Sequence, residues 1–242
     1  MERAARSRPA HLRPGRDRVR VSIVVLGAAA ALAAAAGACG GGRPPPPPAG
    51  PPVLPPAAAG ALRSPDDFLA IADPAERSRA LFLEVSRVLT HPRCVNCHPA
   101  DDSPRQGDDA LRHDPPVARG PDGRGVPGLH CGSCHQDRNL DHARVPGAPD
   151  WHLAPATMAW LGVEPAAICL QLKDPARTGG KDLPAIAHHL EHDPLVAWGF
   201  SPGADRAAPP GSPAAVAALA RAWIDTGAHC PPPTATPAGG AP

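Results

Sequence analysis

The chain has 242 residues, of which 36 are proline and 24 are glycine, about a quarter of the total. Three phenylalanines, four tryptophans and no tyrosine exclude a large aromatic core, and the scarcity of strand-forming runs together with the prolines argues against a broad β-sheet. Seven cysteines and twelve histidines are the other unusual counts. We therefore expect a mostly α-helical protein with extensive irregular loops and little or no sheet.

The first 38 residues are typical of an export signal. Seven arginines precede Val21, and an uncharged apolar stretch over 21–36 leads to small residues and then Cys39. The apolar stretch is about sixteen residues long, short of the roughly twenty that a membrane-spanning helix needs. We predict a lipoprotein-type signal peptide over 1–38 with Cys39 acylated. Plain cleavage nearby and a retained amino-terminal anchor are the alternatives.

Removal of residues 1–38 takes away seven arginines and two acids and changes the formal net charge from +1 to −4. The basic cluster therefore belongs to targeting, and we expect no nucleic-acid partner. Residues 39–62 are rich in proline and predict an extended linker. Residues 232–242 predict a disordered tail. A folded domain over 63–231 is left, which we expect on the periplasmic side of a bacterial membrane, tethered by a lipid anchor.

Helix signals recur along this domain. Ser64 and Pro65 predict a helix start, and a longer helix should follow Pro74 and end before Pro92. Further helices are expected over 166–173 and 185–191, and over a final segment that Ser212 caps and Gly227 ends. The rest, notably 99–160, has no helical or strand period. Such a long irregular region needs something to organise it.

The cysteines indicate what that organiser is. Residues 94–98 (Cys-Val-Asn-Cys-His) and 131–135 (Cys-Gly-Ser-Cys-His) are two copies of the c-type haem attachment pattern. Two thiols a few residues apart can bond one haem, and the adjoining histidine then serves as an axial ligand of the iron. We predict two covalently bound haem c groups, held by Cys94, Cys97, His98, Cys131, Cys134 and His135. A zinc site is the main alternative, but zinc does not require a histidine after each second cysteine.

Lipid and haem attachment would use five of the seven cysteines, which leaves Cys169 and Cys230. In an oxidising compartment an even pair is expected to form a disulfide. The bond would tie the last helix to the short helix after Pro165. Two free thiols are the alternative.

The sixth ligand of each iron is less well specified by the sequence. After signal removal Met158 is the sole methionine, so at most one haem can have a histidine and a methionine as ligands. For the other haem we favour His113 or His152. The remaining histidines with this potential are His130, His142, His188, His189 and His192. A surface position, or a hydrogen bond to a haem propionate, is the alternative role of any of them.

Over about 90–231 the chain resembles bacterial dihaem c-type cytochromes often labelled isoquinoline 1-oxidoreductase subunits. The resemblance is carried by residues 96–99, 119–123, 131–136, 146–155, 172–175, 198–200 and 222–223. It implies a small cytochrome c-like dihaem domain and an exported electron carrier. The family label further implies a molybdenum hydroxylase as partner, although nothing in these residues binds molybdopterin or an aromatic heterocycle.

Three classes of function are compatible with these features. The first is a membrane-tethered electron carrier between redox proteins, such as a molybdenum hydroxylase and a quinol or cytochrome chain. The second is a dihaem peroxidase-like enzyme, which needs an iron with an open position. The third is a haem sensor or a structural subunit of an oxidoreductase complex. We expect the electron carrier rather than an enzyme.

Overall fold

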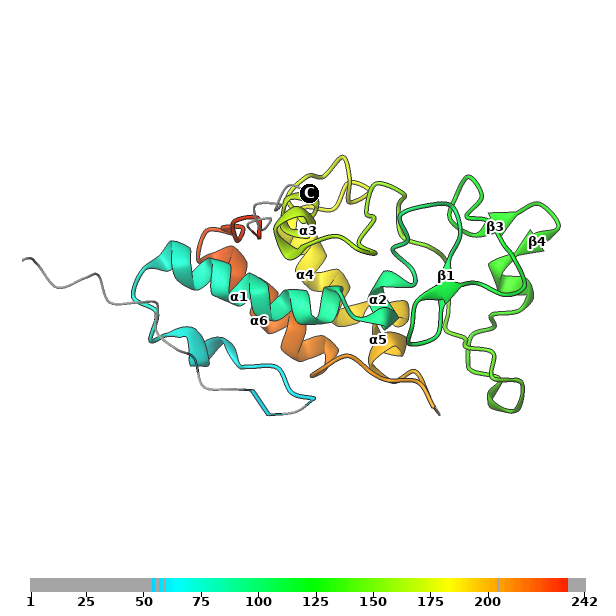
Figure 1. Cartoon of the computed structure of the whole chain (residues 1–242), viewed down its shortest axis with the longest axis horizontal. Coiled ribbons are helices and arrows are strands. Elements are labelled where there is room, and N and C mark those ends of the chain that lie inside the picture. Colours follow the sequence, from blue (N-terminus) through cyan, green and yellow to red (C-terminus); the bar gives the residue numbers. More distant parts are fainter. Residues whose placement is uncertain (1–53, 55–56, 59, 204, 235–242) are drawn as a thin grey trace, which may run out of the picture. The chain divides into compact units, whose positions relative to one another are not determined.

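Six α-helices and two small β-hairpins form most of the regular structure of the residues that the structure describes (Figure 1). The structure is a computed structural model, and it describes residues 54, 57–58, 60–203 and 205–234. The predicted signal peptide, Cys39, most of the linker and the last eight residues lie outside the described residues. The expectation of a mostly helical fold with long loops and very little sheet is confirmed.

The elements follow in chain order. The helices are η1 (Pro65–Phe68), α1 (Pro74–Leu89), α2 (Pro92–Val95), η2 (Cys131–Ser133), η3 (Asp141–Ala143), α3 (Pro165–Leu172), α4 (Leu183–His192), α5 (Pro194–Phe200) and α6 (Pro213–Asp225), where η marks a 3-10 helix. The strands are β1 (Arg105–Gln106), β2 (Leu111–Arg112), β3 (Gly125–Val126) and β4 (Leu129–His130). Strands β1 and β2 pair antiparallel, as do β3 and β4.

Proline, which argues against a sheet, starts the helices instead. Every α-helix in the described part of the chain has proline at its first or second position, where the missing N–H breaks no helical hydrogen bond. The carboxylates of Asp73, Asp182 and Asp193 and the hydroxyl of Ser212 accept backbone N–H groups in the first turns of α1, α4, α5 and α6. The high proline content is therefore partly a set of helix starts.

The core lies between α1, α4 and α6, with α6 in contact with both of the others (Figure 1). Phe82 on α1 and Trp223 on α6 are almost completely buried, with ring centres 4.9 Å apart. Aliphatic side chains such as Val85, Ile168 and Leu219 complete this cluster. A small aromatic core is thus present where the composition excluded only a large one.

A buried carboxylate joins the chain before η1 to α1. The Glu84 side chain is 3% exposed and accepts hydrogen bonds from the backbone N–H of Arg63 at 3.0 Å and from its guanidinium at 2.7 Å. The guanidinium of Arg87 contacts it as well. Burial raises the pKa of Glu84, but the hydrogen bonds from Arg63 and Arg87 outweigh burial and hold the pKa below its usual range.

The predicted disulfide is present. Cys169 on α3 is bonded to Cys230, 61 residues later in the chain. The bond fixes the segment that follows α6 against α3, and the four cysteines of the two repeated motifs form no disulfide.

The structure adds elements that the sequence patterns did not predict. Pro92 comes after the end of α1, as expected, but it also begins α2, which contains the first cysteine of the first motif. Pro194 begins α5. The loop region 99–160 contains both hairpins. The β3–β4 turn is Pro127-Gly128, and the φ of +84° at Gly128 is the conformation that a Pro-Gly type II turn requires. No helix among the described residues has the length and apolarity of a membrane-spanning segment.

Candidate haem-binding sites

The two Cys-x-x-Cys-His segments adopt the same local turn. In the first, the N–H of Cys97 donates to the carbonyl of Cys94 at 3.1 Å. In the second, the N–H of Cys134 donates to the carbonyl of Cys131 at 3.2 Å. The first turn ends α2, and the second is η2, which follows β4 directly. Each motif therefore has its two cysteines within one backbone turn, and the histidine follows directly.

His98 is fixed by a contact far along the sequence. Its Nδ1 lies 2.8 Å from the backbone carbonyl oxygen of Met158. The Trp160 indole stacks on the imidazole with ring centres 3.4 Å apart and planes 4° apart. Burial lowers the pKa of His98 to about 3, so the imidazole is neutral. A proton on Nδ1 leaves the Nε2 lone pair available to a metal.

His135 repeats this arrangement at the second motif. Its Nδ1 lies 2.8 Å from the carbonyl oxygen of Pro146, and the Trp151 indole stacks on the ring with centres 4.5 Å apart and planes 6° apart. Burial lowers the pKa of His135 as well. The carbonyl and indole partners come from 146–160, a segment whose sequence has no period. The irregular loop therefore positions both motif histidines.

The thiols of the first motif are held in their protonated form by their surroundings. Burial, with a smaller effect of the neighbouring Cys97, raises the pKa of Cys94 to about 12. Burial, with a smaller effect of Cys131, raises the pKa of Cys97 to about 11.

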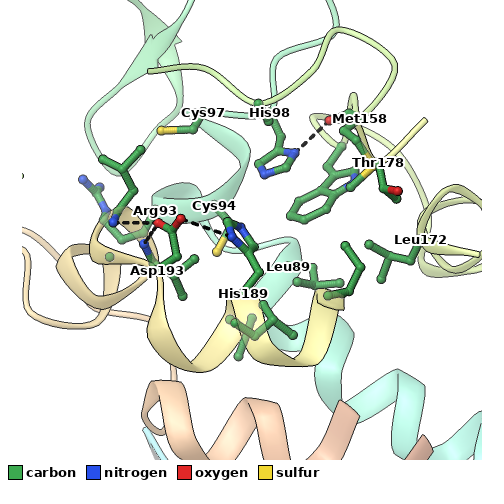
Figure 2. A pocket seen from close by; sticks show the side chains of 18 of the residues that line it. Leu89, Arg93, Cys94, Cys97, His98, Met158, Leu172, Thr178, His189 and Asp193 are labelled. Carbon is green, nitrogen blue, oxygen red and sulfur yellow. Dashed lines mark hydrogen bonds and ion pairs between the residues drawn. The ribbon is translucent and has the colours of Figure 1, made fainter. Parts of the chain in front are cut away.

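The first motif opens onto an apolar pocket (Figure 2). The pocket has a volume of about 140 Å³. Cys94, Cys97 and His98 line it. Its apolar wall includes Val88, Leu89, Leu172, Ile186, Leu190 and Phe200, from α1, α3, α4 and α5.

Polar groups also reach this pocket. Arg93 and Lys181 line it, and Arg93 pairs with Asp108 while its Nε is buried without a hydrogen-bond partner among the described residues. The indole N–H of Trp160 is a second buried donor for which the described residues supply no acceptor. Buried donors without partners are costly and often mark the place of a ligand.

His113, one of the two histidines favoured as a sixth ligand, lies beside the histidine of the second motif. Its ring centre is 5.8 Å from that of His135, with planes 72° apart. The Nδ1 of His113 lies 2.9 Å from the carbonyl oxygen of Pro115, so its Nε2 is also available. With metal–nitrogen bonds of about 2.0–2.1 Å, two imidazoles on opposite faces of one metal have centres about 6 Å apart.

Met158 and His152, the other two predicted ligands, both line the first pocket. Met158 is 5% exposed and presents its carbonyl, rather than its sulfur, to His98. His152 lies two residues before Ala154, whose N–H donates to the carbonyl of Cys97 at 3.0 Å. His152 therefore belongs to the chain segment that runs beside the first motif.

The sequence analysis gave no preference to His189 on α4, which also lines the first pocket. Its Nδ1 lies 3.2 Å from the carboxylate of Asp193 (Figure 2). Burial raises the pKa of Asp193, but the hydrogen bond from His189 and those from the backbone of α5 lower it to about 2. The spacing of a histidine and an aspartate four residues apart on a helix was the available sequence signal.

Comparison with known proteins identifies no relative of this chain. No protein-family model, no curated protein and no solved structure matches the chain. Among the described residues, no three His, Cys, Asp or Glu side chains gather to hold a metal ion by themselves. A haem iron takes its equatorial ligands from the porphyrin and needs only one or two axial ligands from the protein.

Proposed function

We propose that the chain is an exported dihaem c-type cytochrome that carries electrons between redox partners. The observation that carries this proposal is the repetition of one arrangement at both motifs: a tight Cys-x-x-Cys-His turn, an Nδ1 bonded to a backbone carbonyl, and an indole stacked on the imidazole. If the two motifs occurred by chance, there would be no reason for this geometry to repeat. Metal binding by both histidines would explain it, because a metal-binding imidazole needs its other ring nitrogen fixed.

The residues around the first motif fit a haem. Cys94 and Cys97 would hold the macrocycle covalently, and the apolar wall of the pocket would cover its faces. Arg93, Lys181 and the unpaired indole N–H of Trp160 offer positive charge and a donor to its propionates. When bound, haem supplies one-electron chemistry at iron, and the axial ligands set its potential.

For the second centre we infer axial ligation by His135 and His113. The ring separation of 5.8 Å is close to the value for two imidazoles on one metal, and the Nδ1 atoms of both rings bond to proline carbonyls. Two imidazole ligands would give a lower potential than histidine with methionine. They also leave no open position, which favours electron transfer over peroxide chemistry.

Met158 is better suited to support the first centre than to bind its iron. Its carbonyl holds the Nδ1 end of His98, while the iron would lie beyond the Nε2 end. From its own carbonyl oxygen an extended methionine sulfur reaches at most about 6 Å, given ordinary bond lengths. A sulfur bound opposite His98 would have to lie further than this from the carbonyl oxygen, because both imidazole nitrogens and the metal would come between them. We therefore assign Met158 the role of positioning His98.

Export and membrane tethering complete the proposal. The signal peptide would take the chain to the periplasmic side of a bacterial membrane, with a lipid on Cys39 as the anchor, and covalent haem attachment takes place there in the family that the chain resembles. The net charge of −4 after signal removal gives an acidic protein with no basic patch for nucleic acid. Its partners are therefore expected to be redox proteins, with a molybdenum hydroxylase or a quinol or cytochrome chain among the candidates.

The test is to express the exported chain with haem-attachment machinery and count covalent haems from the pyridine haemochrome spectrum of the denatured protein. We expect two per chain in the wild type. The pair Cys94→Ser and Cys97→Ser should leave one, and the pair Cys131→Ser and Cys134→Ser should also leave one. The pair Cys169→Ala and Cys230→Ala is the matched control and should keep two.

This function would be overturned if the wild-type protein carried no covalent haem on a denaturing gel. It would also be overturned if the four motif thiols bound zinc instead. A peroxidase-like enzyme would be indicated by an iron that is high-spin in the ferric wild type and reacts with hydrogen peroxide. For an electron carrier we expect both irons to be low-spin.

A further inference from the structure

Besides His98 and His152, the first pocket contains the imidazole of His189, which no motif identifies. Figure 2 shows His98 at one side of the pocket and His189, on α4, at the other. Ile186 and Leu190, which flank His189 on α4, line the same pocket. The face of α4 that carries His189 is therefore directed at the space that the first haem would fill.

The orientation of His189 is fixed by a carboxylate. Asp193, one helical turn later, lies 3.2 Å from its Nδ1. The same carboxylate accepts the backbone N–H groups of Leu195 at 2.8 Å and Val196 at 3.3 Å as the cap of α5. It is thus anchored on three sides. Within the described residues, Nε2 of His189 has no hydrogen-bond partner, so it remains free for a metal.

We propose that His189, positioned by Asp193, is the sixth ligand of the first haem, so that this centre is bis-histidine. The inference rests on the proposed dihaem function. A carboxylate on the outer nitrogen of a metal-bound imidazole raises the basicity of the ligand. The first centre should therefore have a lower potential than one whose histidines bond only to carbonyls, as His113 and His135 do at the second motif.

His152 is the competing ligand, because it lines the same pocket. Its segment, however, runs beside the motif turn through the hydrogen bond from Ala154 to Cys97. Its Nδ1 bonds to the carbonyl of Asp150 at 2.5 Å and lies 3.6 Å from the carboxylate of the same residue. His152 is therefore tied to Asp150 in the segment beside the motif turn, whereas His189 projects into the pocket from α4.

The test uses the exported holoprotein and begins with a count of covalent haems. This count tests the dihaem function independently of the ligand assignment. The ferric spin state is then measured by electron paramagnetic resonance. We expect no high-spin haem per chain in the wild type and one in His189→Ala. His188→Ala is the matched control, since His188 is the exposed neighbour on the same helix, and it should have none. His152→Ala should also have none.

Two haems per chain with no high-spin signal in His189→Ala would overturn the ligand assignment and leave the dihaem function standing. A high-spin haem in His152→Ala but not in His189→Ala would transfer the role to His152. Failure to find covalent haem in any variant would instead remove the dihaem function on which the assignment rests.

A second variant covers the case in which His189→Ala does not fold. His189→Met should stay low-spin, gain the weak absorption band of a methionine-bound ferric haem, and raise the potential of one of the two haems. Unchanged potentials would contradict the proposal. Asp193→Asn keeps an oxygen for the α5 cap but removes the charge beside His189, and it should raise the potential of the same haem. An unchanged potential there would remove Asp193 as the positioning residue.

Discussion

Ser78 offers a sharp test of how the two ends of the folded region are joined. Its hydroxyl is fully buried on α1 and donates to the carbonyl of Trp223 at 3.1 Å, while it accepts the N–H of His229 at 2.9 Å. The partners lie 145 and 151 residues away. Ser78→Ala keeps the size of the side chain nearly constant and removes both hydrogen bonds.

The magnitude follows from the fate of each partner. The carbonyl of Trp223 still accepts the N–H of Ala228 at 2.9 Å and the hydroxyl of Thr226 at 3.1 Å, so it remains paired. The N–H of His229 loses the partner that Ser78 supplied. An intramolecular hydrogen bond contributes about 0.5–1.5 kcal/mol net, and a buried group left unpaired costs about 1–3 kcal/mol. We expect the free energy of unfolding to fall by about 2 kcal/mol.

Urea unfolding of the holoprotein, followed by far-ultraviolet circular dichroism, measures this change. At roughly 2–4 °C per kcal/mol for a protein of this size, the melting temperature should fall by about 4–8 °C. Ser86→Ala is the matched control, because the hydroxyl of Ser86 bonds only to the carbonyl of Leu83 in its own helix, and its loss should cost under about 0.5 kcal/mol. Equal midpoints for the two variants would refute the reasoning.

Three further predictions concern the disulfide, a buried carboxylate and a closely packed glycine. Replacing Cys169 and Cys230 by alanine opens a loop of 61 residues and should lower the free energy of unfolding by about 4 kcal/mol, seen as a lower urea midpoint; an unchanged midpoint would contradict it. The lowered pKa of Glu84 stabilises the folded state fully above pH 4.5, and this stabilisation is lost as the pH falls towards the folded-state value, because the unfolded chain binds the proton first. Glu84→Gln should flatten stability against pH below 4.5, and an unaltered slope would count against this role. A Cβ on Gly147 would overlap the carbonyl oxygens of two nearby residues and so displace the neighbouring Pro146, whose carbonyl fixes His135. Gly147→Ala should therefore convert one haem to high-spin, whereas Gly132→Ala, with open space around the added Cβ, should not. Identical spectra for the two variants would rule this out.

Local signals determined much of the fold. The capped helix starts, the proline stops and the glycine after α6 act through hydrogen bonds within a few residues, so the sequence predicts α1, α3, α4 and α6 closely. The sequence did not predict the two short helices α2 and α5, for different reasons. Pro92 was taken only as a stop, and the seven residues of α5 are too few to show a helical period.

The candidate site divides in the same way. The two motif turns are local, and their spacing alone predicts both the thiol pairs and the adjoining histidines. The disulfide followed from counting cysteines in an oxidising compartment. His113 was one of two histidines favoured as sixth ligand, and its separation from His135 fits that role, which stays a prediction until the iron is observed.

Tertiary structure alone decided which distant groups meet the motif histidines. His98 and the carbonyl of Met158 are 60 residues apart, and neither the carbonyl nor the stacked indole has a signature in the sequence. The same holds for His189, which lies in the pocket only because α4 packs beside α6. Composition and spacing therefore determined what the cysteines can bind, whereas the packing of helices and of an aperiodic loop decided what surrounds each imidazole, since contacts between distant residues depend on the whole fold.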